Sequence, residues 1–184
     1  MNIITINKVN CKDCYKCVRY CPVKAIRVVD GHAEVVDDRC VGDGKCIGIC
    51  PQHAKQVRRD ADIVRALLAS GRQVIASVAP AVAGVFGEQT PQLIGTLKAL
   101  GFARVEETVR TAEAVARASA AAAEEGKTKM TTACPAVVAL LQKYYPQHID
   151  RLTPVASPMV AHARLLHEEH DADIAVVFIG PCVA

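Results

Sequence analysis

The chain has 184 residues, of which 51% are apolar and 22% charged, and its formal net charge is +3. This length suits one ordinary domain or two small ones, and the apolar fraction is enough for a packed core. The small net charge gives no indication of a nucleic-acid partner. The sequence contains no run of about 18 apolar residues, which is the length that a membrane span needs. The amino terminus lacks a basic-then-apolar signal, so we expect a cytoplasmic protein.

The first elements are predicted to be short strands. Residues 2–9 alternate apolar and polar side chains and are rich in β-branched residues, which predicts a strand. Residues 25–29 and 33–36 flank Asp30 and Gly31, which predicts a hairpin.

Seven of the nine cysteines fall in a repeat between residues 11 and 51. The first half reads C-x2-C-x2-C-x3-C-P, and aligning Cys11 with Cys40 places the second half on the same pattern. This spacing is typical of two-cluster ferredoxins, in which three cysteines bind one cubane and the fourth, before the proline, binds the other. The predicted ligands of cluster one are Cys11, Cys14, Cys17 and Cys50, and those of cluster two are Cys21, Cys40, Asp43 and Cys46.

A zinc site and a disulfide scaffold are the alternatives to two 4Fe-4S clusters. Zinc sites typically pair their cysteines as two C-x2-C ends, and neither alternative explains the prolines or the repeat. Cysteines used as metal thiolates also agree with a reducing compartment. We therefore expect two 4Fe-4S clusters, whose charge is largely offset by an excess of Lys and Arg over Asp and Glu between Met1 and Arg59.

The second half of the repeat has Asp43 where the first half has Cys14. A carboxylate is a harder and less covalent ligand for iron than a thiolate, so the iron it holds is expected to be exchangeable. The alternative is that Asp43 does not bind iron and cluster two is a 3Fe-4S cluster. The sequence leaves both readings open.

A domain boundary is predicted near Arg59, giving a two-cluster ferredoxin domain at residues 1–59 and a second domain at residues 60–184. The apolar, β-branched run at 74–78 predicts a buried strand of a parallel sheet. Further strands are predicted at 103–105, 129–132 and 174–179, and helices at 60–70, 91–100, 111–125, 135–145 and 158–169. The expected fold class is an α+β ferredoxin-like domain followed by a partial α/β domain with a parallel sheet.

Two cysteines remain outside the repeat. Cys134 and Cys182 each adjoin a proline at the end of a predicted strand, where α/β sheets place ligands, although free cysteines also serve as small apolar side chains. His162, His167 and His170 are not expected to bind metal, because a five-residue step does not keep two side chains on one helix face.

Several segments of the second domain resemble the large subunit of iron-iron hydrogenases. The segment 131–136 resembles the first active-site motif of that family, and 180–184 resembles the second. Further similarity lies at 78–82, 97–102, 143–146 and 157–159. The resemblance implies that Cys134 and Cys182 are ligands of the 4Fe-4S part of a hydrogen-activating cluster. A third 4Fe-4S or di-iron cluster of this kind needs further ligands, which the family carries in a third motif.

The chain departs from the family at two positions within these motifs. Ala133 stands where the resemblance implies a second, proton-carrying cysteine, and Gly180 stands where it implies methionine. Because the sequence stops before the third motif, we expect the 184 residues to be a fragment or a truncated form without hydrogenase turnover, and we assign no catalytic residue.

The leading hypothesis is an iron-sulfur electron-transfer protein whose ferredoxin domain passes electrons to or from a hydrogenase-like domain of a sensory or low-activity kind. Its expected partners are a redox protein and a downstream signalling domain or protein. The alternatives are a catalytic hydrogenase with another proton route, which Ala133 disfavours, and an iron-sulfur assembly or scaffold protein.

Overall fold

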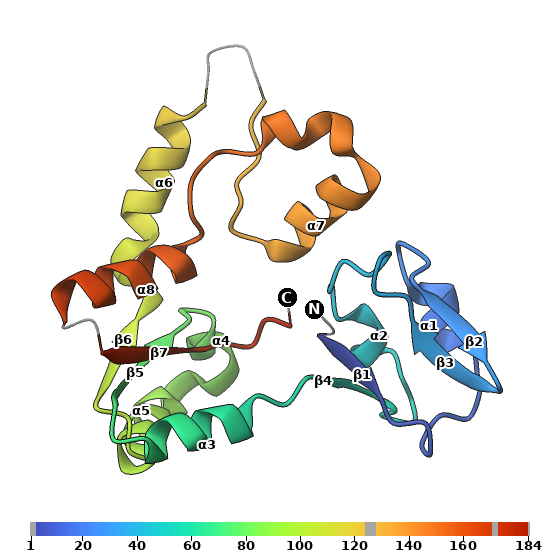
Figure 1. The fold of residues 1–184 in the computed structure, drawn as a ribbon, viewed down its shortest axis with the longest axis horizontal. Helices are drawn as coiled ribbons and strands as arrows, with labels where there is room; N and C mark the ends of the chain where they lie inside the picture. The colour runs from blue at the N-terminus through green and yellow to red at the C-terminus, as the bar shows by residue number, and fades with distance from the viewer. Residues whose placement is uncertain (1–2, 124–127, 171–172, 184) are drawn as a thin grey trace. The chain divides into compact units, whose positions relative to one another are not determined.

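The computed structural model describes residues 3–123, 128–170 and 173–183 (Figure 1). The chain divides into two compact units. The first comprises Met1–Arg59, Cys134–Leu152 and Val183–Ala184, and the second comprises Asp60–Ala133 and Thr153–Cys182. The boundary predicted near Arg59 places residues 134–152 in the second domain. That boundary stays a prediction.

The first unit contains two small antiparallel sheets. Strand β1 (Ile4–Ile6) pairs with β4 (Lys55–Val57), and β2 (Ile26–Val29) pairs with β3 (His32–Val35), which confirms the predicted hairpin. Asp30 and Gly31 both have positive φ, of 50° and 72°, as a type I′ hairpin turn requires.

The core of the first unit is made partly of thiols. Two short helices, α1 (Lys16–Tyr20) and α2 (Lys45–Gly48), each bury one cysteine, Cys17 and Cys46 respectively. Together with Cys21 they pack against apolar side chains of the strands, among them Ile4 and Ile26. The same unit includes α7 (Pro135–Tyr144) and the 3-10 helix η3 (Pro146–Arg151).

The second unit is built on a parallel sheet of three strands in the order β6-β5-β7. These strands are β5 (Gln73–Val78), β6 (Arg104–Glu107) and β7 (Ile174–Ile179), and the predicted parallel sheet is confirmed. Side chains alternate between the two faces of β5: Val74 and Ala76 belong to one apolar core and Ile75 to another. Burial on both faces explains why residues 74–78 are apolar except for Ser77.

Helices supply the partners for both faces of this sheet. On the Val74 face the core includes Val82 of α4 (Val82–Phe86) and Leu97 of α5 (Thr90–Ala99), and α3 (Ala61–Ala69) adds half-buried leucines. On the other face Leu166 of α8 (Pro158–Glu169) packs against Ile75. The remaining elements are η1 (Gly87–Gln89), η2 (Thr108–Thr111) and α6 (Ala112–Ala121).

One predicted strand is wrong. Residues 129–132 form no strand; within them Met130 makes an isolated bridge, in which its carbonyl accepts a hydrogen bond of 2.8 Å from the Thr153 N–H. Among the described residues β6 and β7 are the edge strands of the sheet, and this segment pairs with neither of them. Residues 124–125 of the predicted helix at 111–125 lie outside the described residues. No helix in the described ranges is both long and apolar enough to span a membrane.

Candidate metal centres

The four predicted ligands of cluster one line a single pocket of the first unit. Cys11 and Cys14 come from the loop before α1, Cys17 from α1, and Cys50 from the segment after α2. Residues 13 and 15 have positive φ, of 51° and 56°, which bends the loop around the pocket. The rest of the lining is mixed: its apolar part is Val18, Val28, Ala33 and Ala54, and its polar part includes Asp13, Gln52 and Lys55. Cysteines at the spacing of a cubane motif thus converge on one place.

Backbone N–H groups point at four of the thiols. The donors to Cys21 and Cys50 are Ala25 and Ala54, each at 3.3 Å from the sulfur. Cys40 accepts from the N–H of Gly42 at 3.4 Å, and Cys11 accepts from that of Ala33 at 3.5 Å. Such donors favour a sulfur that carries negative charge, as a thiolate bound to iron does.

The buried thiols differ in acidity for identifiable reasons. Burial raises the pKa of Cys17, and burial reinforced by the nearby Asp43 and Cys40 raises the pKa of Cys46 to about 11. For Cys50 burial acts in the same direction, but N–H donors from residues 52, 54 and 55 outweigh it and lower the pKa. Cys17 and Cys46 are therefore protonated at neutral pH without metal, and binding of iron releases their protons.

Three of the four predicted ligands of cluster two interact electrostatically. Cys46 is buried on α2, Cys40 is half-buried, and Asp43 is exposed between Gly42 and Gly44, whose φ angles are 75° and 73°. Cys21 is buried in the same core as Cys46. Whether Asp43 binds iron stays a prediction.

The described residues include no group of three His, Cys, Asp or Glu side chains that could hold a single metal ion. The ligands of a cubane bind different iron atoms, so a cubane does not need its thiols to meet at one point.

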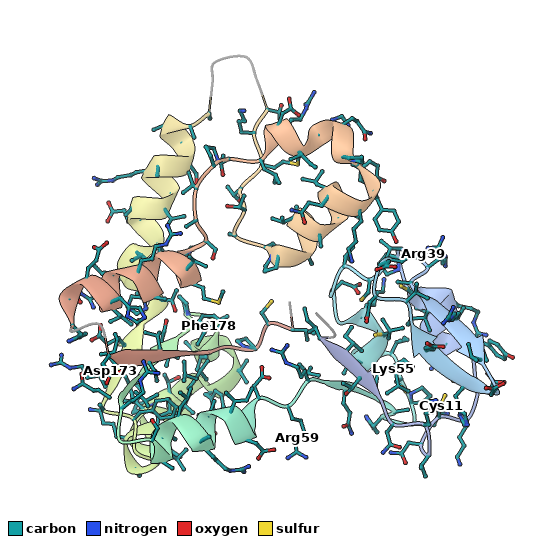
Figure 2. The ribbon with its side chains drawn as sticks, viewed as in Figure 1. Cys11, Arg39, Lys55, Arg59, Asp173 and Phe178 are labelled. Atoms are coloured by element: carbon teal, nitrogen blue, oxygen red, sulfur yellow. The ribbon has the colours of Figure 1, made fainter. Side chains whose placement is uncertain are left out.

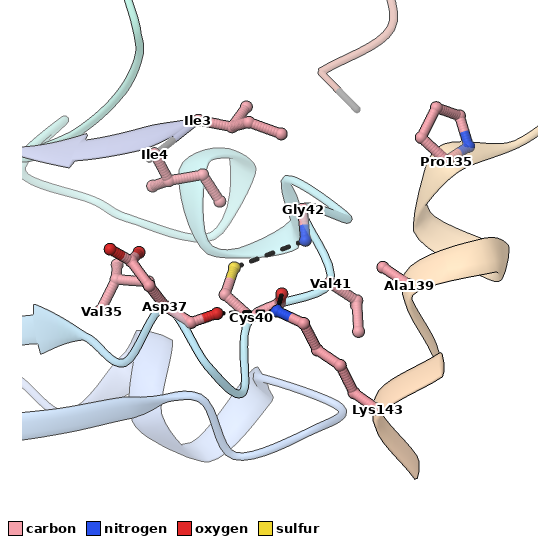
Figure 3. Close-up of a pocket in the computed structure, with 10 residues that line it drawn as sticks. All are labelled: Ile3, Ile4, Val35, Asp37, Cys40, Val41, Gly42, Pro135, Ala139 and Lys143. Carbon is pink, nitrogen blue, oxygen red and sulfur yellow. Dashed lines mark hydrogen bonds between the residues drawn. The ribbon is translucent and has the colours of Figure 1, made fainter. Parts of the chain in front are cut away.

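Helix α7 is attached to the loop that carries Cys40 (Figure 3). The Lys143 ammonium donates to the carbonyl oxygens of Asp37 and Cys40, both at 2.7 Å. The Tyr144 hydroxyl lies 2.8 Å from the carbonyl oxygen of Arg39, to which it donates. Sequence reasoning missed this attachment, because nothing in the spacing of Lys143 and Tyr144 pairs them with a loop so far back along the chain.

The two remaining cysteines, Cys134 and Cys182, belong to different units. Cys134 is exposed and precedes α7 in the first unit, and Cys182 is exposed in the second. Their joint role as ligands stays a prediction. A Cβ added at Gly180 would lie 2.9 Å from the Cβ of Ala79, so a larger side chain fits there only if its neighbours move.

His162 and His167 lie in α8, and His170 directly follows it. Of these three, His162 is fully buried and contacts the sheet. Its Nδ1 lies 2.8 Å from the Ser77 hydroxyl, which in turn lies 3.0 Å from the hydroxyl of Thr108. Burial lowers the pKa of His162, and the Arg110 guanidinium acts in the same direction. This histidine is a neutral part of the core.

These features are those of an iron-sulfur protein with a cysteine-rich unit and a parallel α/β unit. A family profile described as a 4Fe-4S dicluster domain matches residues 3–51. Another, described as the iron-only hydrogenase large subunit, C-terminal domain, matches residues 72–184. The second match covers more than half of the chain, so the protein belongs to the iron-only hydrogenase large-subunit family.

A curated relative matches the dicluster region. Over 57 residues the chain is 39% identical to the B subunit of the ion-translocating oxidoreductase complex of Methanosarcina acetivorans. The match covers 31% of this chain and 22% of that protein, so the chain spans about a fifth of the relative's length.

Proposed function

We propose that the protein is an iron-sulfur electron carrier in which two clusters of the first unit exchange electrons with the hydrogenase-like part of the chain. The observation that carries the proposal is the convergence of Cys11, Cys14, Cys17 and Cys50 on one pocket. A bound cubane supplies reversible one-electron chemistry. The chain supplies its thiols, the N–H donors to sulfur and a pocket lined partly by apolar side chains.

In this proposal the ligands of cluster two are Cys21, Cys40, Asp43 and Cys46. The Lys143 and Tyr144 contacts hold the backbone of the Cys40 loop, so α7 acts as a support for that cluster. Cys134 and Cys182 are proposed ligands of a further cluster in the complete hydrogenase-like site. Because Ala133 has no side chain that transfers a proton, we propose a sensory or low-activity role for that site.

The proposed partner is another redox protein. The relative in Methanosarcina acetivorans is named as one subunit of an oxidoreductase complex, which supports a protein partner for the dicluster unit. A signalling partner remains an expectation from the sequence.

Metal analysis tests the proposal. Protein reconstituted anaerobically should contain about eight iron atoms per chain with matching sulfide, because the repeat provides ligands for two cubanes. A Cys11→Ser, Cys14→Ser, Cys17→Ser variant should lose about half of that iron, since cluster one would keep a single thiolate. Stoichiometric zinc with negligible sulfide would overturn the proposal. Rapid transfer of clusters to apo-ferredoxin, without electron transfer, would instead favour an assembly protein.

A further inference from the structure

A lysine is buried beside the cysteine pocket of the first unit. Lys55 is 3% exposed, and it lines the same pocket as the four predicted ligands of cluster one. Figure 2 labels Lys55 and one of these ligands, Cys11. Lysine is among the residues least often buried, because its ammonium group loses hydration there. Its burial indicates that this environment offers compensating negative charge, which iron-bound thiolates provide.

The internal repeat provides a direct comparison for this position. The alignment that places Cys40 on Cys11 also places Lys55 on Ile26. Each residue begins a strand, and each follows an alanine that is 1% exposed and donates its N–H to a cysteine sulfur at 3.3 Å. Ile26 is also buried, at 7% exposure. The two positions therefore match in backbone and burial and differ in charge.

Lys55 interacts with thiols of both predicted ligand sets. Burial raises the pKa of Cys17 and the pKa of Cys46, and the charge of Lys55 is the largest opposing influence at each. The backbone N–H of Lys55 also acts to lower the pKa of Cys50. Two of these three cysteines, Cys17 and Cys50, belong to the predicted ligands of cluster one, and one belongs to those of cluster two.

We propose that Lys55 is a buried positive charge that raises the reduction potential of cluster one, and to a smaller extent that of cluster two. The inference rests on the proposed electron-transfer function. Reduction adds one electron to a cubane and breaks no bond, so the reduced form carries one more negative charge. A positive charge held beside the cluster in a low-dielectric site stabilises that form more than the oxidised one. The effect is larger at cluster one because Lys55 lines its pocket.

The test compares wild-type protein with Lys55→Met, both reconstituted with iron and sulfide. Each is titrated with dithionite as the electron donor, in the presence of mediators, and the reduced clusters are followed by electron paramagnetic resonance. Asp43→Cys assigns the signals, since it alters a residue of the cluster-two set alone. We expect Lys55→Met to reduce the ratio of reduced to oxidised cluster one about tenfold at a given solution potential, equal to about 59 mV for a one-electron couple.

Lys12→Met is the matched control. Lys12 is exposed and adjacent to Cys11, so this variant removes the same formal charge from a position that water screens. Its cluster-one potential should stay close to that of the wild type. An unchanged potential in Lys55→Met, the same shift in Lys12→Met, or a larger shift at cluster two than at cluster one would overturn the inference.

Cluster loading separates this inference from the proposed function. Wild-type protein that binds no iron contradicts the function itself, whereas normal iron and sulfide with an unshifted Lys55→Met potential contradicts the role of Lys55 alone. If Lys55→Met does not assemble clusters, two other variants are compared instead: Lys55→Arg, which keeps the positive charge, and Lys55→Gln, which removes it. A lower cluster-one potential in Lys55→Gln than in Lys55→Arg supports the inference, and equal potentials refute it.

Discussion

At the scale of single residues, Asp43 distinguishes the two halves of the cysteine repeat. It is exposed on a loop between two glycines of positive φ, so its carboxylate is accessible to water as well as to a metal. A carboxylate binds iron less covalently than a thiolate does. If Asp43 holds one iron atom of cluster two, as the repeat predicts, that iron atom is the one expected to be lost first.

Mild oxidation with ferricyanide should therefore convert cluster two to a 3Fe-4S form while cluster one survives. Asp43→Cys should abolish the conversion and leave the iron content of freshly reconstituted protein unchanged, because a thiolate holds the fourth iron more strongly. Low-temperature electron paramagnetic resonance of both proteins after matched treatment measures the effect. Equal behaviour of the two proteins would mean that Asp43 is a bystander or a firm ligand.

Because of His162, the free energy of unfolding of the second unit should depend on pH. Burial lowers its pKa in the folded protein, Arg110 lowers it further, and Glu106 and Glu169 oppose this. As the pH falls through about 6.5, the unfolded chain takes up the proton before the folded chain does. The free energy of unfolding should consequently decrease from about pH 6.5 downwards, towards the lower folded pKa.

His162→Gln should lose this part of the pH dependence and cost about 1 kcal/mol near neutral pH through its altered contact with Ser77. Urea unfolding at a series of pH values, followed by circular dichroism, provides the comparison. His167→Gln is the control, since His167 is exposed on the same helix. A pH profile that is the same in wild type and His162→Gln would contradict this account.

At the scale of elements, prediction succeeded where the physical signal is local. The largely apolar, β-branched sequence of β5 predicts a buried strand, and the turn residues between β2 and β3 predict a hairpin. Helices α1 and α2, of 5 and 4 residues, are too short to show a periodicity. The pairing of β1 with β4 joins segments far apart in the chain, so neither strand alone contains the information that specifies its partner.

In the candidate site, too, the features with a local signal in the sequence could be predicted and those that depend on tertiary packing could not. Cysteine spacing predicted that three cysteines of the first half of the repeat share a pocket with Cys50 of the second half, because the motif pairs the fourth cysteine of each half with the other cluster. That these thiols bind a cluster stays a prediction. Lys55 gave no signal, since a lysine in a short strand is usually solvated. The contacts of Lys143 depend on tertiary packing and were equally invisible.

Helix α7 leads to a prediction about the Cys40 loop. Lys143→Met should remove both hydrogen bonds to that loop, at a cost of about 1 kcal/mol for a partly solvated ammonium donor. Amide hydrogen exchange at residues 40–42 should become faster, and cluster two should be lost sooner on exposure to air. Gln142→Met, at an exposed neighbouring position, is the control. Exchange that is equally slow in both variants would show that the loop does not depend on Lys143.

At the scale of the whole molecule, membership of the hydrogenase family does not imply hydrogen turnover by this chain. The residue before Cys134 is alanine, and a positioned proton donor or acceptor typically contributes about 10²- to 10⁴-fold to a rate. With the di-iron cofactor and maturation factors supplied, hydrogen evolution should stay at least about 100-fold below that of a hydrogenase with the relay cysteine. A hydrogen electrode with an active hydrogenase in parallel measures this, and robust turnover would refute the role given to Ala133.

The path of the chain through its two units has a consequence for how such a protein could be assembled from older parts. The chain leaves the first unit after Arg59, returns to it at Cys134, leaves again after Leu152 and returns at Val183. Two genes joined end to end would produce one passage between modules, whereas here a helix coded far downstream supports the loop that carries Cys40. Exchanging Met1–Arg59 for another ferredoxin domain would therefore require α7 to change as well. We expect residues 1–59 and α7 to be inherited together.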